Sequence, residues 1–168
     1  MAIKDILLLG NPLLQEISCA VQESDLNNLA EEVQDLQDTL RDFRERHGVG
    51  RAIAAPQIGV MKRIIYMQVD KPEILINPVI SDMSREMIEL WDDCMSFPEL
   101  LVKVARHRSC LISYRNLSWD KVTLDLEDNL SELLQHECDH LDGILAVSRA
   151  IDGQSFALKS QANLLESS

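Results

Sequence analysis

Apolar side chains recur with a helical period between residues 24 and 48. They fall every three or four positions and so share one stripe, made of Leu26, Leu29, Val33, Leu36, Leu40 and Phe43. This spacing is typical of an amphipathic helix that packs one face against a core. Ser24 is the candidate N-cap, and Gly48 is placed to end the helix.

The period changes after this helix. Residues 48–59, GVGRAIAAPQIG, are rich in glycine and small side chains, which suits a backbone that passes close to another group. Four runs rich in β-branched and apolar residues follow and are separated by polar turns, which predicts short antiparallel strands. The runs are residues 62–69, 73–80, 100–116 and 121–127.

A second helical period covers residues 128–145, DNLSELLQHECDHLDGIL. Asp128 or Asn129 is the candidate cap, and the helix is expected to end near Gly143. The tail, residues 155–168, is only weakly helical in pattern. The order of a helix, then strands, then a helix predicts an α+β fold.

The size of the chain predicts its number of domains, and its charge argues against certain partners. With 168 residues, of which 46% are hydrophobic, the chain is long enough for one core, so we expect a single domain over residues 1–168. A formal net charge of −12 argues against partners such as DNA or an anionic membrane surface, both of which require basic patches.

The chain carries no signal of export or of membrane insertion. No run reaches the roughly 20 apolar residues of a membrane span, and residues 1–14 lack the basic start and cleavage site of a signal peptide. The four cysteines lack the density of a disulfide framework, so a reducing, cytoplasmic location is expected. They are Cys19, Cys94, Cys110 and Cys138.

Candidate chemistry is concentrated in the sequence HECDH, residues 136–140. His136 and His140 lie one helical turn apart on the same face, so both imidazoles can reach one ion. Two histidines at this spacing with Glu137 between them form a zinc-site signature, whereas the alternative is a polar surface helix. The pattern predicts a metal site that still needs a third protein ligand.

Cys94 is the best candidate for that third ligand, because it lies in a polar, turn-like stretch just before a predicted strand. Its alternative role is that of a small buried thiol. The remaining cysteines are expected to pack: Cys19 and Cys110 among apolar neighbours, and Cys138 on the far side of the helix. Downstream carboxylates are weaker candidates, namely Asp142, Asp152 and Glu166.

Three motifs in this order resemble those of the peptide deformylases, in a divergent, type III-like form. They are GRAIAAPQ, DDCMS and QHECDH, and the resemblance spans nearly the whole chain. It implies short antiparallel β-sheets around a central metal-binding HExxH helix, together with the N-terminal amphipathic helix. It also implies that the metal is Fe²⁺, with Zn²⁺ or Ni²⁺ as replacements, and that its ligands are Cys94, His136 and His140.

The resemblance further implies catalytic roles. Glu137 would be the acid and base, and Gln57 with the backbone N–H of Met95 would bind the oxyanion. The chemistry suits these residue types, because a divalent ion both polarises a formamide carbonyl and lowers the pKa of water. The alternatives are a helix-surface carboxylate for Glu137 and a hydrogen bond within its own loop for Gln57.

The chain departs from the family pattern near the expected substrate pocket. Ala52 and Asp93 stand where glycines are usual, and Arg51 and Glu132 are charged where apolar residues are usual. Arg51 and Glu132 either meet across the pocket and make it polar, or lie at its rim or in solvent. The expected pocket residues are Gly50, Arg51, Ala52, Asp92, Glu132 and Leu133. The resemblance also places a basic partner for Asp139 at Arg106, and a contact between the two is expected to fix the metal-binding helix against the sheet.

Three functions follow from this reading. The favoured one is removal of the formyl group from N-terminal formyl-methionine of nascent peptides, with ribosome-associated nascent chains among the expected partners. The second is the same reaction on a more polar N-formyl substrate, such as a formyl amino acid or formyl-lysine. The third is a non-catalytic metal-binding protein, which the intact set of Gln57, Cys94 and Glu137 argues against.

Overall fold

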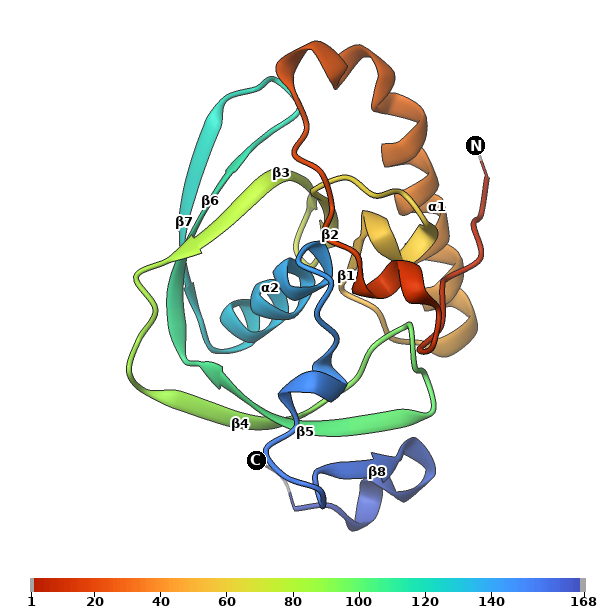
Figure 1. Cartoon of the computed structure of the whole chain (residues 1–168), viewed down its shortest axis with the longest axis vertical. Coiled ribbons are helices and arrows are strands. Elements are labelled where there is room, and N and C mark those ends of the chain that lie inside the picture. The colour runs from red at the N-terminus through yellow and green to blue at the C-terminus, as the bar shows by residue number, and fades with distance from the viewer. Residues whose placement is uncertain (1, 167–168) are drawn as a thin grey trace.

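The fold is built around one buried helix. The computed structural model describes residues 2–166, and Figure 1 shows α2 (Asp128–Leu141) at the centre with strands on several sides and α1 (Ala30–His47) at the edge. The strands are β1 (Ala52–Ala54), β2 (Ile64–Gln68), β3 (Pro72–Ser81), β4 (Met87–Asp92), β5 (Leu100–His107), β6 (Ser109–Arg115), β7 (Lys121–Glu127) and β8 (Phe156–Leu158). The predicted α+β fold with antiparallel strands is confirmed.

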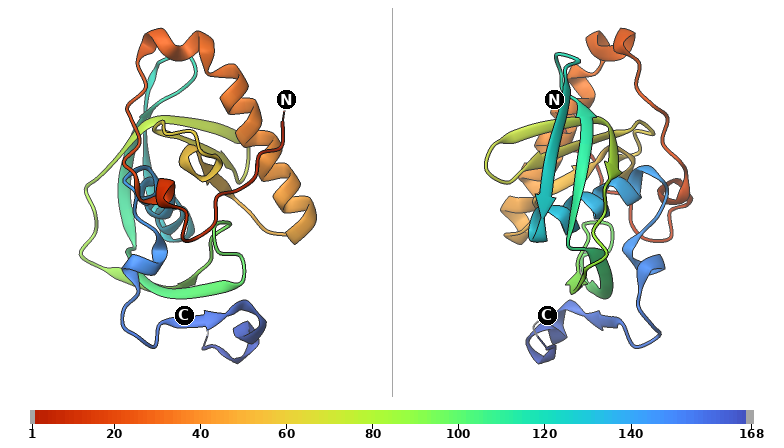
Figure 2. Two further views of the ribbon diagram at one scale, coloured as in Figure 1. Left: turned by 45° about the vertical axis from the view of Figure 1, so that its right-hand side comes forward. Right: turned by 90° about the vertical axis from the view of Figure 1, so that its left-hand side faces the viewer.

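Two antiparallel sheets enclose α2. The five-stranded sheet has the order β1-β2-β3-β6-β7, and the three-stranded sheet has the order β4-β5-β8. Apolar side chains of α2 pack on the five-stranded sheet, and every residue from Ser131 to Leu141 is buried. Figure 2 shows the C-terminal segment running along β5, at the end of the molecule opposite the start of α1.

The predicted apolar stripe of α1 is largely buried, and the helix ends where expected. Leu29, Leu36 and Leu40 have no exposed surface, and Gly48 takes the left-handed conformation with φ 71°. The prediction that Ser24 caps this helix is wrong. A short 3₁₀ helix, Glu23–Asn28, comes first, and α1 begins at Ala30, six residues after Ser24. The side chain of Asp25 accepts the Gln22 N–H and stabilises that separate turn.

The start of α2 also differs from the prediction. Glu127 holds the cap position without a side-chain hydrogen bond, so neither Asp128 nor Asn129 caps the helix. Asp128 has a positive φ of 46°, and its carboxylate accepts a hydrogen bond from Arg108 at 2.8 Å. The end agrees with the prediction, since Gly143 lies just beyond the helix with φ 72°.

Strand pairing corrects three further predictions. The run 100–116 is two strands in different sheets, broken at Arg108, which pairs with Glu86 and Asp128. The sequence analysis missed β4, which has only six residues, two of them charged, but pairs with β5 along its whole length. The tail is not simply helical, because Phe156–Leu158 forms β8 before a 3₁₀ helix, Lys159–Leu164.

Cys110 and Cys138 are buried as expected, whereas Cys19 is exposed. Cys19 lies on the N-terminal segment, where its backbone pairs with Lys62 while its side chain faces out. Within residues 2–166, no helix is both long enough and apolar enough to cross a membrane.

Candidate metal centre

Three ligand atoms converge beside α2. The Nε2 atom of His140 lies 3.2 Å from Nε2 of His136 and 3.4 Å from Sγ of Cys94, which follows the end of β4. All three side chains are buried. A tetrahedral ion with bonds of about 2.0–2.3 Å holds its ligand atoms about 3.3–3.8 Å apart, so this thiol and these two imidazoles fit a divalent metal ion.

Asp92 orients the first histidine. His136 donates its Nδ1–H to Oδ2 of Asp92 at 2.8 Å, which turns Nε2 toward Cys94 and His140. Burial alone would raise the pKa of Asp92, but His136 and Arg106 hold it below its usual value. The sequence analysis placed Asp92 in the substrate pocket, and although it lines that pocket, its carboxylate is engaged by His136 and Arg106.

The electrostatics of the site favour a cation. Burial alone would lower the pKa of His136, but the neighbouring Asp92 and Cys94 outweigh burial and raise it well above the usual value. Burial and the nearby His136 lower the pKa of His140, so this imidazole is neutral, as a metal ligand must be. The site therefore favours one positive charge, whether a proton or a metal ion carries it.

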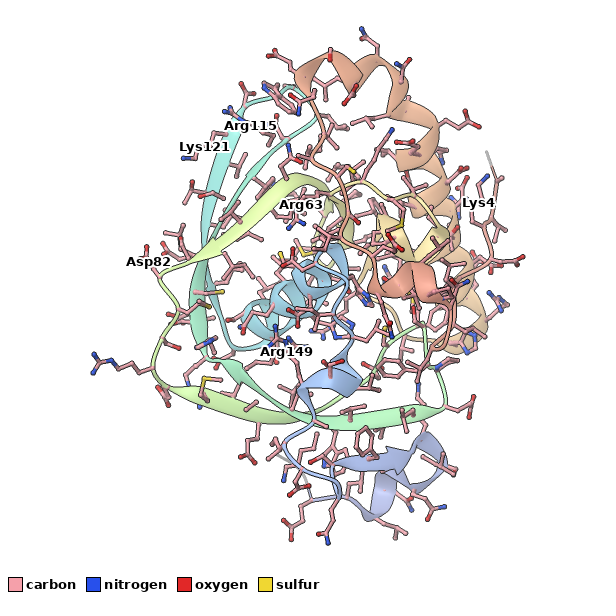
Figure 3. The ribbon with its side chains drawn as sticks, viewed as in Figure 1. Lys4, Arg63, Asp82, Arg115, Lys121 and Arg149 are labelled. Carbon is pink, nitrogen blue, oxygen red and sulfur yellow. The ribbon has the colours of Figure 1, made fainter. Side chains whose placement is uncertain are left out.

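Asp139 of α2 forms ion pairs with two arginines. Arg106 Nη1 donates to Oδ2 of Asp139 at 2.6 Å, so the expected contact is present. Arg149 donates to both carboxylate oxygens of Asp139, from Nε at 2.6 Å and from Nη2 at 2.8 Å. Figure 3 shows Arg149 beside α2. The sequence analysis missed Arg149, because nothing in the local pattern after α2 indicates that the chain turns back there.

Glu137 is a buried carboxylate beside the three ligand atoms. Its Oε2 atom has no hydrogen-bond partner among residues 2–166, and the side chain lines the same pocket as Cys94 and His136. Burial raises its pKa to about 7, with His136 offsetting part of the rise. A carboxyl group with this pKa can both take and give a proton near neutral pH.

Gln57 is fixed next to the sulfur atom of Cys94. Its Oε1 accepts the N–H of Ala54 at 3.0 Å, and its Nε2 donates to Ser96 Oγ at 3.1 Å while lying 3.6 Å from Cys94 Sγ. The loop hydrogen bond considered for Gln57 is therefore present, and the amide N–H group still faces the site. The backbone N–H of Met95 has no hydrogen-bond partner within the described residues.

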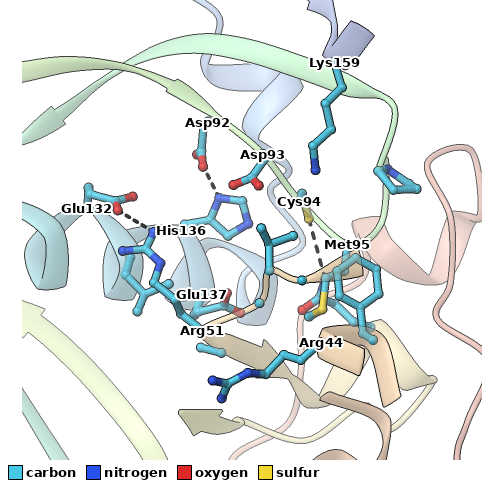
Figure 4. Close-up of a pocket in the computed structure, with 18 residues that line it drawn as sticks. Arg44, Arg51, Asp92, Asp93, Cys94, Met95, Glu132, His136, Glu137 and Lys159 are labelled. Atoms are coloured by element: carbon cyan, nitrogen blue, oxygen red, sulfur yellow. Dashed lines mark hydrogen bonds and ion pairs between the residues drawn. The ribbon is translucent and has the colours of Figure 1, made fainter. Parts of the chain in front are cut away.

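A pocket of about 370 Å³ opens onto this site (Figure 4). All six expected pocket residues line it. Arg51 Nη2 lies 2.6 Å from Glu132 Oε1, so the two charged side chains meet. Burial raises the pKa of Glu132, and Arg51 offsets part of that rise. Arg51 is 43% exposed and the Glu132 side chain only 7%, so the pair runs from the buried wall of the pocket toward solvent.

The pocket also contains residues that the sequence analysis did not assign to it. Arg44 comes from α1, Asp93 from the turn before Cys94, and Lys159 from the C-terminal segment. Asp93 was considered only as a turn residue. Its place directly before Cys94 was a usable signal, whereas Lys159 had none because its segment reaches the pocket only through strand pairing.

Comparison with known proteins decides the family. The family model for polypeptide deformylase matches residues 3–155. A peptide deformylase of Parafrankia sp. is 42% identical over 89% of this chain and 79% of its own length, and peptide deformylase 1 of Prochlorococcus marinus is 34% identical over 96% and 88%. The chain belongs to the polypeptide deformylase family.

Solved deformylase structures share the fold. That of Thermotoga maritima has a TM-score of 0.82 and 29% identity, covering 90% of this chain and all of its own. That of Synechococcus elongatus, in complex with actinonin, has a TM-score of 0.83 and 27% identity, covering 90% of this chain and 81% of its own. The protein is accordingly a metal-dependent hydrolase of the deformylase family, and the candidate metal centre suits that chemistry.

Proposed function

We propose that this deformylase removes the formyl group from N-terminal formyl-methionine of nascent peptides, with a divalent ion held by Cys94, His136 and His140. The observation that carries the proposal is the convergence of these three buried ligand atoms beside the buried carboxylate of Glu137. The cytoplasm, where ribosomes produce such chains, is the location that goes with this function.

The chemistry divides between the ion and the protein. When bound, a divalent ion polarises the formyl carbonyl and lowers the pKa of water. Glu137 accepts a proton from the attacking water at a carboxylate oxygen and delivers it to the departing amine nitrogen. The pKa of Glu137, about 7, suits both transfers, and such a group contributes about 10²- to 10⁴-fold in rate.

Negative charge develops on the formyl oxygen as water adds to the carbonyl carbon. The Nε2–H of Gln57 and the backbone N–H of Met95 are the donors we assign to this oxygen. Ala54 holds the Gln57 amide in one orientation through its Oε1 atom, so little reorganisation is needed during the reaction. One such donor is worth about 3 kcal/mol of transition-state stabilisation.

Fe²⁺ is the ion we assign to the site, with Zn²⁺ or Ni²⁺ as replacements. One thiolate and two imidazoles form a donor set of intermediate softness that accommodates all three metals. The thiolate of Cys94 also makes an iron-loaded site sensitive to oxidation, so the enzyme should be handled without oxygen.

A second candidate substrate class is favoured by one observation. The Arg51–Glu132 pair places charge in the pocket beside the candidate metal centre. A charged wall packs poorly against a thioether, because burying an ion pair against apolar groups carries a desolvation cost. Free formyl amino acids and formyl-lysine are therefore the alternative substrates.

The test is formate release by anaerobically iron-loaded protein from formyl-methionine peptides, formyl-lysine and free formyl amino acids. We expect formyl-methionine peptides to be hydrolysed, and Glu137→Gln to lose about 10²-fold or more while keeping one metal ion per chain. Glu132→Leu separates the two substrate classes, since an unchanged preference would exclude a role for the pair. Full activity of Glu137→Gln would mean that another group is the base.

A further inference from the structure

The C-terminal segment brings a lysine to the pocket. β8 pairs antiparallel with β5 in the register Leu100↔Leu158, and the N–H of the next residue, Lys159, donates to the carbonyl of Glu99 at 2.8 Å. These backbone bonds fix where the lysine side chain starts. Figure 4 shows it extending from the C-terminal segment toward Asp93 and Cys94, and it lines the same pocket as the candidate metal centre.

Lys159 has an unusual electrostatic position. The chain carries a formal charge of −12, yet this lysine, half-buried at the pocket, forms no ion pair with any of residues 2–166. Two carboxylates of the pocket are already paired with cations. Asp92 binds His136 and Arg106, and Glu132 binds Arg51.

Asp93 is the remaining acidic group on the same side of the pocket. It is exposed and forms no ion pair within the described residues. It competes with an anionic ligand for Lys159 but does not neutralise the lysine in this structure. Arg44 lines the opposite wall in Figure 4, where its guanidinium donates to the carbonyl of Gln68 at 3.4 Å.

We infer that Lys159 binds a carboxylate of the substrate and so favours N-formyl substrates that carry a negative charge beyond the formylated residue. This inference rests on the proposed deformylase function. A peptide with its formyl group at the candidate metal centre must leave the pocket past its partly exposed residues, and Lys159 is one of these. The carboxylate is either the C-terminus of a short peptide or an acidic side chain.

The effect belongs to binding rather than to the chemical step. A partly exposed ion pair contributes modestly, so a matched carboxylate should raise kcat/KM by about threefold to fivefold. The change should lie in KM, because Lys159 would contact a part of the substrate remote from the reacting carbon. Added salt should weaken the preference, since exposed charges are screened.

The experiment compares charged and neutral substrates that are otherwise identical. Formyl-Met-Ala-Ser is tested as the acid and as the amide, and formyl-Met-Asp-Ala amide is tested against formyl-Met-Asn-Ala amide. The first pair reports a terminal carboxylate and the second an acidic side chain. We expect at least one pair to favour the charged member, Lys159→Gln to abolish the preference, and Lys159→Arg to retain it.

Further variants test whether the preference for the charged substrate depends on Lys159 itself. Lys121→Gln removes an exposed lysine on β7 and should leave the preference unchanged, whereas Asp93→Asn should increase it by removing a competitor. Equal rates within both substrate pairs for the wild type would overturn the inference. So would a preference that persists in Lys159→Gln or that is lost only in Arg44→Gln.

Calorimetry with the deformylated products, Met-Ala-Ser and Met-Asp-Ala amide, against their neutral partners gives a readout that does not depend on turnover. At least one charged product should bind about threefold to fivefold more tightly to the wild type but not to Lys159→Gln. If no formyl peptide releases formate, the proposed function fails, while the calorimetry still decides whether Lys159 selects a carboxylate. Equal affinities within both product pairs would count against it.

Discussion

Neighbouring charges decide how three buried carboxyl groups near the candidate metal centre behave. Asp92 lies against His136 and Arg106, which hold its pKa below the usual value in spite of burial. Glu132 has one partner, Arg51, and its pKa is still raised. Glu137 has no hydrogen-bond partner for Oε2 within residues 2–166, and its pKa rises to about 7. The group with the least compensation is therefore the one suited to proton transfer.

This shift predicts how the stability of chelator-treated, metal-free protein depends on pH. Since the folded-state pKa of Glu137, about 7, exceeds its ordinary value of 4.5, the folded state binds more protons between these values. Its contribution is therefore fully present below pH 4.5 and is lost as the pH rises through 7. Relative to Glu137→Gln, the wild type should lose about 3 kcal/mol of unfolding free energy across this window, as measured by urea unfolding.

Glu99→Gln is the control for this prediction, because it removes an exposed carboxylate from the loop before β5. It should follow the wild type at every pH. Parallel curves for the wild type and Glu137→Gln between pH 4.5 and 8 would show that Glu137 has an ordinary pKa.

At the scale of elements, α2 is held from both sides. Its apolar face packs on the five-stranded sheet, while Asp139 connects it to Arg106 on β5 and to Arg149 beyond the helix. The Arg106 side chain is only 2% exposed, so its charge depends on Asp139 and Asp92 for compensation. The network therefore couples the position of the ligand helix to the three-stranded sheet.

Asp139→Asn should destabilise the protein by about 3 kcal/mol or more, because it removes one partner of a buried charge. It should also weaken metal affinity by about 10- to 100-fold, as loss of outer contacts does at metal sites. Urea unfolding and metal competition titrations measure the two effects.

The matched variant is Asp142→Asn, three residues further along the chain. Its pair with Arg63 has side chains 51% and 21% exposed, so its loss should cost about 1 kcal/mol or less. Similar losses for the two variants would mean that the Asp139 network contributes no more than a surface ion pair.

At the scale of the whole molecule, the N-terminal segment closes over the end of α2. Ser18 donates its N–H to the carbonyl of Leu141 at 2.9 Å. Gly143 lies against the backbone of Gln15, where an added Cβ would come within 2.4 Å of the carbonyl oxygen. The conformation of Gly143, φ +72°, also suits glycine best. A residue after the metal helix therefore fixes a segment more than a hundred positions earlier.

Gly143→Ala should cost about 3 kcal/mol or more, since backbone strain adds to a collision with main-chain atoms that cannot rotate away. Gly59→Ala separates the backbone strain from the collision. Gly59 has a similar φ of +80° but nothing within 4 Å of an added Cβ, so it should cost only about 1 kcal/mol. Thermal and urea unfolding of both variants measure these costs. Equal losses of unfolding free energy would show that the backbone at Gln15 moves aside at no cost in stability.

The sequence by itself predicted those features that depend on residues near one another in the chain. The apolar stripe of α1, the pair of histidines one turn apart on α2, and the stop signals at Gly48 and Gly143 follow from helical geometry. Motif order also pointed to Cys94 as the partner of the histidines, and the three ligand atoms do converge.

Strand partners, the branching of the Asp139 network and the composition of the pocket were decided by tertiary structure. β4 and β8 exist because β5 offers hydrogen bonds on both edges, and each is short: β4 has six residues and β8 only three. Sequence reasoning offered the contact of Arg51 with Glu132 as one of two alternatives and took the contact of Arg106 with Asp139 from the family resemblance. It missed Arg149 and Lys159. The physical reason is range: periodicity records which face of an element is buried, whereas contacts between distant segments depend on how the sheets close around α2.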